Sequence, residues 1–210
     1  LVYVSEFCGG GFGSKAPAYP VIAIPAYMAR KTGRPVLMRI SRAEENFIGV
    51  CRPAFQGRLK IGFQPDGRIT AADLFIVQNN GPNSGGGDYN SAGGAMSIVY
   101  TPPAMRFRGI PVLTNTPPTG PQRGPGQNQL ACAVEPILDK AAHQLGIDLI
   151  AIRRINAPDN SARYGADQGP VTSAYQREAL DIGAEQFDWE ARRARSGQRR
   201  GSKVTGVAVG

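Results

Sequence analysis

The sequence predicts an α+β fold, in which mixed sheets pack against helices. Apolar and polar residues alternate over 58–64 and 68–78, which is typical of strands, whereas apolar residues recur at helical spacing over 18–32 and 127–145. Strand patterns precede helix patterns in both halves of the chain, without the regular alternation of a parallel α/β sheet. Together these observations favour the α+β class.

The first element is a glycine loop that follows a short, strand-like apolar run. The run covers 2–8, and the loop reads Gly-Gly-Gly-Phe-Gly-Ser-Lys over 9–15. Glycine runs are found where a backbone takes positive φ or approaches another group closely. Because a helical pattern follows, backbone N–H groups of this loop can face an anionic ligand. The alternative is a plain strand-to-helix turn, and the glycines alone leave both interpretations open.

This loop is neither of two common nucleotide-binding motifs. The Walker motif needs Gly-Lys-Ser/Thr in direct succession, whereas Ser14-Lys15-Ala16 follows Gly13 here. The dinucleotide fingerprint needs a glycine at position 14 and an acidic residue about 20 residues later, and the chain has neither. If this loop binds phosphate, it therefore does so in a protein that is neither a Walker-motif nucleotide-binding protein nor a dinucleotide-binding protein of the fingerprint type.

A helix and then a strand are predicted after the first loop. The helix covers 18–32, and Pro20 suits its first turn. Pro25 lies in the middle of the pattern and is expected to kink the helix. Gly33 is expected to end it, and the apolar run at 36–40 is predicted to form a strand.

A hairpin and a long loop follow. The alternating runs 58–64 and 68–78 flank Pro-Asp-Gly at 65–67, which is typical of a tight turn. Residues 79–94 are poor in apolar side chains and rich in Gly, Asn and Ser, so they are predicted to lack regular structure. Such a stretch inside a domain is usually functional or disordered. A further strand is predicted over 105–114.

A second glycine loop precedes the longest helix pattern. The loop reads Gly-Pro-Gln-Arg-Gly-Pro-Gly over 120–126, and a helix is predicted over 127–145. Pro136 is expected to bend this helix and Gly146 to end it. Two glycine loops that lead into helices, one of them with a guanidinium, suit a single site for a large phosphorylated cofactor. The predicted apolar face of the helix consists of Leu130, Val134, Ile137, Leu138 and Ala141.

The C-terminal part predicts two further helices and the beginning of a strand at 204–210. Arg153 and Arg154 are expected to be exposed on the first of these helices. Serine and aspartate are favoured at helix N-caps because their side chains accept from free backbone N–H groups. The helices and their expected caps are 149–156 with Asp148 and 174–195 with Ser173.

The chain of 210 residues carries a net charge of +8, a balance also found in nucleic-acid binders. Much of the charge lies near the C-terminus, and no aromatic residues are interleaved with it, as a single-strand binder would need. The basic cluster is therefore interpreted as a solvated helix end and linker. Its residues are Arg192, Arg193, Arg195, Arg199, Arg200 and Lys203.

Cysteine and histidine usage disfavours a metal bound by protein ligands. Cys8, Cys51 and Cys132 are too far apart for a Cys-x-x-Cys pair, and each is predicted to be a small buried residue. The single histidine, His143, falls within a helix pattern. No apolar run reaches the roughly 18 residues that a membrane-spanning helix needs, so no span is predicted.

Taken in order, these motifs resemble the large subunit of the molybdenum hydroxylases, the xanthine dehydrogenase and aldehyde oxidase family. The resemblance implies the fold of the family's molybdenum-cofactor-binding domain and an internal segment of a larger subunit. Residues 1–127 would form a first cofactor-binding part, and 128–210 a helical part that leads into a further cofactor-binding region. The matching segments are 9–15, 32–36, 41–45, 62–70, 100–102, 114–115, 123–126 and 152–156.

The resemblance also implies site residues. In this family the two glycine loops approach the molybdenum–pterin cofactor, which gives cofactor-binding roles to Gly11, Phe12, Gly13 and Arg123. Backbone N–H groups can bind oxo and phosphate oxygens, and an arginine adds a fixed positive charge. The family's catalytic base is a glutamate near the end of the large subunit, outside this chain. No catalytic residue and no protein ligand to a metal is therefore assigned.

None of the glutamates within the chain is assigned the role of the catalytic base. Glu44, Glu45 and Glu135 are interpreted as solvated or helix-capping side chains. If the resemblance holds, an isolated chain of this sequence is expected to be inactive.

Departures from the purine-oxidising members concern the substrate pocket. Ala16, Ser91 and Pro125 stand where those members carry glutamate, arginine and phenylalanine. Loss of these groups disfavours a purine and favours an aldehyde or a small aromatic heterocycle. The implied reaction is hydroxylation with water-derived oxygen, with two electrons passed onward.

The implied cofactor is molybdenum-molybdopterin, in its cytosine dinucleotide form. Iron–sulfur clusters and FAD are expected only on partner chains or domains, because three scattered cysteines cannot ligate such clusters. The expected partners are the remaining parts of the large subunit, an iron–sulfur subunit, and a flavin subunit or other electron acceptor. Family members work in the bacterial cytoplasm or periplasm, and the cytoplasm is expected here.

Two other classes of function stay open at this stage. The glycine loops are also consistent with a module that binds a phosphorylated ligand without redox chemistry. The net positive charge is consistent with a nucleic-acid-binding domain, which would show a steep salt dependence of binding. Molybdenum and pterin analysis separates both from the oxidoreductase.

Overall fold

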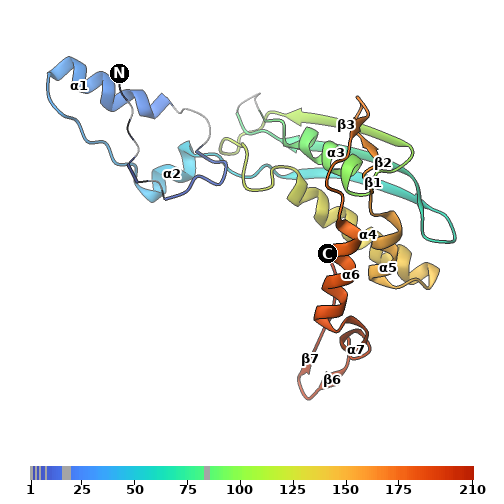
Figure 1. The fold of residues 1–210 in the computed structure, drawn as a ribbon. Helices are drawn as coiled ribbons and strands as arrows, with labels where there is room; N and C mark the ends of the chain where they lie inside the picture. The colour runs from blue at the N-terminus through green and yellow to red at the C-terminus, as the bar shows by residue number, and fades with distance from the viewer. Residues whose placement is uncertain (1, 3, 5, 8, 16–19, 83–85) are drawn as a thin grey trace. The chain divides into compact units, whose positions relative to one another are not determined.

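The computed structural model describes all residues except 1, 3, 5, 8, 16–19 and 83–85 (Figure 1). Contacts group the chain into two compact units. The first comprises 1–56, 77–89 and 110–125, and the second comprises 57–76, 90–109 and 126–210. Among the described residues, helices accompany one three-stranded sheet and two short two-stranded sheets, as the α+β prediction requires.

The elements of the first unit begin with a 3₁₀ turn and two helices. The strands of the main sheet, in the order β1-β2-β3, and helix α3 each contain residues of both units. The helices α4 to α7 and the short strands belong to the second unit. In chain order the elements are η1 (Pro20–Ile22), α1 (Ala23–Thr32), α2 (Arg42–Ile48), β1 (Phe55–Phe63), β2 (Ile69–Asn79), α3 (Asp88–Val99), β3 (Met105–Val112), α4 (Gln127–Leu145), α5 (Leu149–Asn156), β4 (Arg163–Tyr164), β5 (Gly169–Pro170), α6 (Gln176–Phe187), α7 (Trp189–Arg193), β6 (Arg199–Arg200) and β7 (Lys203–Val204).

The predicted hairpin is confirmed as β1 and β2. The N–H of Gln64 donates to the carbonyl of Arg68 at 2.8 Å, and Gly67 takes a left-handed φ of 87° in the turn. From Ala72 onward alternate residues of β2 are buried, which agrees with the period-2 pattern of its sequence, and Ile69 at the start of the strand is buried outside this series. In the second unit, the core side of this strand is formed by Ile69, Ala72, Leu74 and Ile76.

Helix α3 contradicts the prediction that 79–94 lacks regular structure. Its sequence is rich in glycine and small polar residues, which have low helix propensity. Tertiary packing overrides that propensity, because a Cβ at Gly93 would lie only 2.8 Å from the ring of Phe107 on β3. Glycine therefore lets the helix approach the strand closely. The local sequence at this position, taken without its tertiary contacts, predicts a loop.

Helices α4 and α5 agree closely with prediction and pack against each other. Gly146 ends α4 in the left-handed conformation, with a φ of 68°. Asp148 caps α5 by accepting from the N–H groups of Ile150 at 2.8 Å and Ala151 at 3.1 Å. The predicted apolar face of α4 is confirmed by burial of Leu130, Val134, Leu138 and Ala141.

Two N-terminal predictions need correction. The α-helix starts at Ala23, so Pro25 lies in its first turn, where its missing N–H has no helical partner to lose and causes no mid-helix kink. Residues 36–40 form no strand, because they pair with no neighbouring strand among the described residues. Of the run predicted as a strand at 2–8, positions 3, 5 and 8 lie outside the described residues.

Helix α2 was missed, although the sequence carries a signal for it. Ser41 accepts from the N–H of Glu44, and the Glu44 carboxylate accepts from the N–H of Ser41 at 2.8 Å, which forms a capping box. The pattern Ser-x-x-Glu at 41–44 is the sequence signature of this cap. The predicted helix-capping role of Glu44 is thereby confirmed.

The helix predicted over 174–195 is in fact two helices, α6 and α7. Asp188 breaks it with a left-handed φ of 55°, which aspartate tolerates better than most residues. The break turns Trp189 into the protein, where its indole N–H donates to Asp148 at 3.0 Å. Ser173 does not cap α6, which has Tyr175 at its N-cap. The strand predicted from 204 is limited to Val204 in β7.

Candidate functional site

The first glycine loop holds its backbone in conformations that favour glycine. Gly10 and Gly13 have φ values of 95° and 102°, and Phe12 between them also has a positive φ, of 54°. The hydroxyl and the N–H of Ser14 both donate to the carbonyl of Gly11, at 3.0 and 3.1 Å. The loop is a tight turn that leaves the Phe12 ring 64% exposed.

The two glycine loops meet inside the first unit. A Cβ built on Gly13 would lie 2.6 Å from the carbonyl oxygen of Pro121 and 3.3 Å from the Cα of Gln122. Only glycine fits at this contact, because both the space and the positive φ exclude a side chain. Segments more than a hundred residues apart in the sequence therefore form one surface.

The second glycine loop is held by the segment 50–52, which sequence reasoning did not single out. Cys51 forms a parallel bridge with Thr119: its N–H donates to Pro118 at 2.9 Å, and its carbonyl accepts from Gly120 at 3.0 Å. The Gln122 side chain donates to the carbonyl of Val50 at 2.9 Å. Arg52 donates to the carbonyls of Arg123 and Gly124, at 2.5 and 3.2 Å.

The predicted site residues fall into both units. Gly11, Phe12, Gly13 and Arg123 lie on the two joined loops, and Pro125 lies half-buried at the end of the second. The Arg123 side chain is exposed and has no hydrogen bond or ion pair to the part of the chain that the structure describes. Ser91 belongs to the second unit, and Ala16 lies outside the described residues.

The second loop leads directly into a helix, and after the first loop the described helical residues begin with η1 at Pro20. Residue 126 is the N-cap of α4, whereas 16–19, between the first loop and η1, lie outside the described residues.

A pocket of about 580 Å³ adjoins the first loop. Ser14 and Lys15 line it on the side of this loop, and Gln122 lines it on the side of the second loop. Arg42 also lines it, paired with Glu45 at 2.5 Å. The pocket thus combines apolar walls with the Lys15 side chain and the Arg42–Glu45 ion pair, which suits a ligand with both apolar and polar parts.

Cysteine positions differ from prediction. Cys51 lines this pocket and is exposed, and Cys132 is exposed on α4, so neither is the buried residue expected from cysteine's usual behaviour. Cys8 lies outside the described residues. Among those described, no group of His, Cys, Asp and Glu could hold a metal ion, and His143 is exposed.

A buried polar cluster completes the first unit. The Gln78 amide donates to the Asn80 side chain at 2.5 Å and accepts from the N–H of Tyr89 at 2.8 Å. Asp88 is only 4% exposed, and one of its oxygens has no partner among the described atoms. Burial raises the pKa of Asp88, and the charge of Arg52 opposes this rise.

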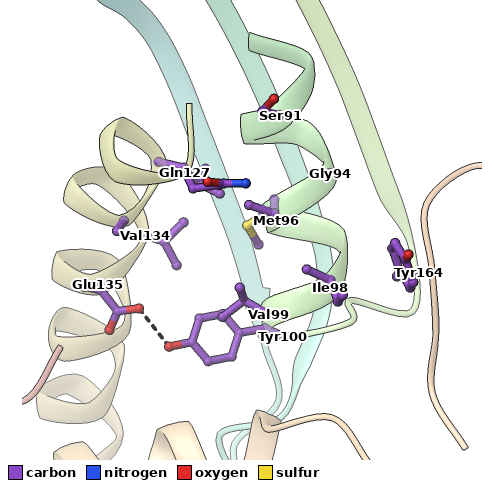
Figure 2. A pocket seen from close by; sticks show the side chains of 13 residues that line it. Ser91, Gly94, Met96, Ile98, Val99, Tyr100, Gln127, Val134, Glu135 and Tyr164 are labelled. Atoms are coloured by element: carbon purple, nitrogen blue, oxygen red, sulfur yellow. Dashed lines mark hydrogen bonds between the residues drawn. The ribbon is translucent and has the colours of Figure 1, made fainter. Parts of the chain in front are cut away.

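The second unit contains an apolar pocket between α3 and α4 (Figure 2). It has a volume of about 600 Å³, and Ser91 and Gln127 lie at one end, with Tyr100 and Glu135 at the other. The remaining side chains that line it are mainly aliphatic. Ser91 therefore faces a largely apolar space.

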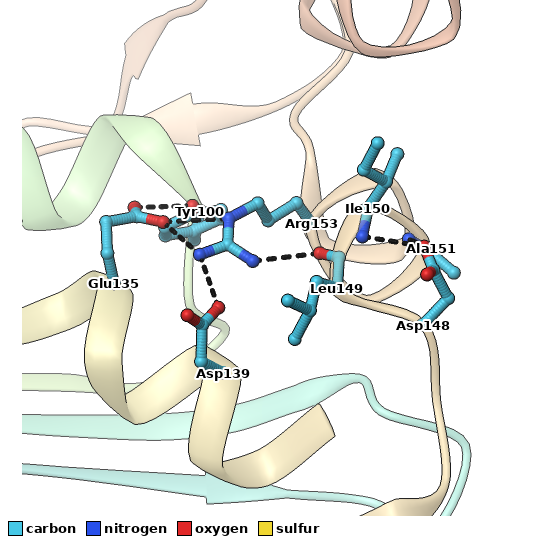
Figure 3. Close-up of polar contacts among 8 residues, drawn as sticks. All are labelled: Tyr100, Glu135, Asp139, Asp148, Leu149, Ile150, Ala151 and Arg153. Atoms are coloured by element: carbon cyan, nitrogen blue, oxygen red, sulfur yellow. Dashed lines mark hydrogen bonds and ion pairs between the residues drawn. The ribbon is translucent and has the colours of Figure 1, made fainter. Parts of the chain in front are cut away.

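A polar network joins α4 to α5 beside this pocket (Figure 3). Arg153 is buried and donates to Glu135 and Asp139, both at 2.8 Å. Tyr100 donates to the other oxygen of Glu135 at 2.8 Å, and its burial, with the charge of Glu135, raises its pKa. Burial opposes the charge on Arg153, but the two carboxylates outweigh it and raise the pKa of Arg153.

Two predictions about this network are corrected. Arg153 is not exposed, because the carboxylates on α4 provide it with a buried ion pair, whereas Arg154 is exposed as predicted and pairs with Asp181. Glu135 is neither free in solvent nor a helix cap. The sequence pattern does not predict this arrangement, because it depends on how α4 and α5 pack.

No described helix is long and apolar enough to cross a membrane.

Comparison with protein families gives one match, over residues 1–157, to the model described as the molybdopterin cofactor-binding domain. The chain is 34% identical over 214 residues to the xanthine dehydrogenase molybdenum-binding subunit of Escherichia coli O157:H7. That alignment covers 98% of this chain and 28% of the relative. The chain thus spans little more than a quarter of the relative's length.

Solved structures give the same result. Quinoline 2-oxidoreductase from Pseudomonas putida 86 superposes with a TM-score of 0.77 and 28% identity, over 90% of this chain and 25% of the other. Aldehyde oxidoreductase from Desulfovibrio gigas gives a TM-score of 0.77 and 28% identity, over 90% of this chain and 21% of the other.

Proposed function

This chain belongs to the molybdopterin cofactor-binding domain family, and we propose that it is the cofactor-binding segment of a molybdenum hydroxylase. The matches confirm the resemblance drawn from the ordered motifs and the predicted fold. The proposed enzyme hydroxylates an aldehyde or an aromatic heterocycle with oxygen derived from water. The observation that carries this function is the contact of Gly13 with Pro121, which joins the two glycine loops into one surface.

The joined loops fit the cofactor chemically. Arg123 offers an exposed guanidinium with no partner among the described residues, which suits a phosphate or another anionic group. Gly11 and Gly13 offer backbone without side chains, and the exposed Phe12 ring offers an apolar face. When bound, the cofactor supplies the two-electron chemistry at molybdenum. The residues of this chain hold and orient it.

The substrate proposal rests on three positions taken from the family resemblance, of which Ser91 lines the apolar pocket of the second unit. Ser91 and Pro125 lack the charge and the aromatic ring that a purine site would use, and Ala16 lacks a carboxylate. We therefore propose an aldehyde or a small heterocycle rather than a purine.

The finer features of the enzyme are proposed from the family resemblance. They are the cytosine dinucleotide form of the cofactor, an iron–sulfur subunit, a flavin subunit or other acceptor, and a cytoplasmic location. The exposed positions of Cys51 and Cys132 support the view that clusters are held by partner chains, because a cluster needs four ligands brought together.

Metal and pterin analysis of the assembled enzyme tests this proposal. Wild type should contain both, and Arg123→Ala should lower molybdenum content about tenfold at limiting cofactor, since a hydrogen bond to a charged group contributes roughly 1.5–3 kcal/mol. Arg39→Ala, at an exposed position of the same unit, is the matched control. A phosphorylated ligand without molybdenum would instead identify a non-redox binding module.

A further inference from the structure

Arg52 reaches two consecutive carbonyls of the second glycine loop. Its Nη2 lies 2.5 Å from the carbonyl oxygen of Arg123, and its Nη1 lies 3.2 Å from that of Gly124. A guanidinium presents its N–H groups in a rigid plane, so two bonds from one fork fix both position and orientation. The first carbonyl belongs to Arg123, the residue proposed to contact the cofactor, and the second belongs to the next residue, Gly124.

The shape of the loop makes this double contact possible. In extended backbone, successive carbonyls point in opposite directions, so one fork could not bind both. Gly124 has a left-handed φ of 67°, which turns the chain between the two carbonyls. The fork of Arg52 therefore recognises the turned conformation of the loop and not an extended one.

The base of Arg52 is itself fixed. The preceding residue, Cys51, is bonded through its N–H and its carbonyl to the segment 118–120, and the following residue, Pro53, is fully buried. The guanidinium thus acts from a rigid support onto a loop of glycine and proline residues, whose own hydrogen bonds are few.

We propose that Arg52 is the positioning residue of the second glycine loop, which it holds in the one conformation that presents Arg123 to the cofactor. The proposal rests on the proposed function for the identity of that ligand. It predicts that losing the fork loosens the loop before cofactor binds, so that binding must then order the loop at a cost in affinity.

Hydrogen exchange and cofactor content, measured on the assembled enzyme, test this role. In Arg52→Met, cofactor-free protein should exchange the amide of Gly120, which donates to the Cys51 carbonyl at the start of the loop, about tenfold faster, because the loop loses two charge-assisted bonds. Molybdenum content should fall about tenfold at limiting cofactor and recover at excess. Arg52→Lys should give intermediate values, since a single ammonium lacks the fork. Arg39→Met is the control, and unchanged exchange in α4 and α5 shows that the variants fold.

Each result bears on the proposal. Unchanged exchange of the Gly120 amide in Arg52→Met would overturn it, and so would faster exchange with normal molybdenum content at limiting cofactor. Arg52→Lys behaving as wild type in both measurements would show that charge alone suffices, which contradicts positioning by a fork. Wild type without molybdopterin would refute the proposed function and the role toward the cofactor, whereas the exchange data would still show whether Arg52 orders the loop.

Discussion

At the scale of single residues, Gly13 is the position where the site tolerates least change. Gly13→Ala should lower molybdenum content about tenfold or more, because the methyl group would lie 2.6 Å from the Pro121 carbonyl and force the loops apart. Far-UV circular dichroism should stay unchanged, since α4 and α5 do not involve this contact. Molybdenum content and circular dichroism measured on one sample check this.

Gly9→Ala provides the matched control, because a Cβ at Gly9 meets no atom within 4 Å among those described. Normal cofactor content in Gly13→Ala would remove the contact between the loops from the proposed site. A loss of circular dichroism together with molybdenum would assign Gly13 a role in folding instead.

Asp88 makes a prediction about pH. Its pKa is raised above an ordinary value of 3.8 by burial, so the folded state binds its proton more tightly than the unfolded state does. The resulting stabilisation is complete below about pH 4 and is lost as pH rises through the raised pKa. Asparagine at position 88 cannot ionise, so the Asp88→Asn variant does not lose this stabilisation. The free energy of unfolding of the variant minus that of wild type should therefore increase as pH rises toward 7. Urea unfolding at a series of pH values measures this, and parallel pH profiles would contradict it.

Residue patterns predicted the loops of the site but not how they are held. The run at 9–15 and the arginine of the second loop were recognisable because glycine and arginine have distinctive backbone and charge properties. Arg52 and the contact of Gly13 with Pro121 were not, because both depend on distant segments meeting in space. The roles of Gly11, Phe12, Gly13 and Arg123 toward the cofactor stay predictions.

At the scale of elements, prediction succeeded where local signals and tertiary packing agree. Helix α4, its glycine C-cap and the Asp148 cap of α5 follow from patterns within a few residues. Helix α3 did not, because its stability comes from close packing of Gly93 on Phe107. The break at Asp188 was also missed, since the burial of Trp189 that accompanies it is a tertiary effect.

The ion pairs between α4 and α5 should be important for stability. The Arg153 side chain is 3% exposed, and its partners Glu135 and Asp139 are 23% and 32% exposed. Arg153→Met leaves both carboxylates without their cation, which should lower the free energy of unfolding by about 3 kcal/mol. Chemical denaturation, followed by the fluorescence of Trp189, measures this change.

Arg154→Met on the same helix is the control. Arg154 pairs with Asp181, but the two side chains are 55% and 47% exposed, so solvent screens the pair. Its loss should lower the free energy of unfolding far less than the loss of Arg153 does. Equal costs for the two variants would mean that burial gives the Arg153 network no special weight.

At the scale of the whole molecule, the segment covers 28% of the xanthine dehydrogenase subunit it matches and divides into two interleaved compact units. The predicted parts, 1–127 and 128–210, are defined by ligand binding and stay a prediction. The two units do not follow a single cut in the sequence, since the main sheet contributes to both. A pattern read along the chain cannot reveal such interleaving, because it arises from pairing between distant strands.

The carboxylates of the described residues lead to a prediction about activity. Glu44 is bound in a capping box, Glu45 pairs with Arg42, and Glu135 is held by Arg153 and Tyr100. We therefore assign none of them as a general base. Loss of a general base typically lowers a rate by about 10²–10⁴-fold. The 210-residue chain, reconstituted with molybdopterin, should bind the cofactor but show no turnover of an aldehyde or aromatic heterocycle.

The measurement needs molybdenum content and turnover from the same sample, because an empty chain would be inactive for a trivial reason. The assembled enzyme, assayed with the same substrates and electron acceptor, provides the reference rate. Turnover by the loaded chain at a rate close to this reference would mean that a base lies within 1–210, and Glu135→Gln would then be the first variant to examine. Loading without turnover would place the base on the remaining parts of the subunit, as the family resemblance implies.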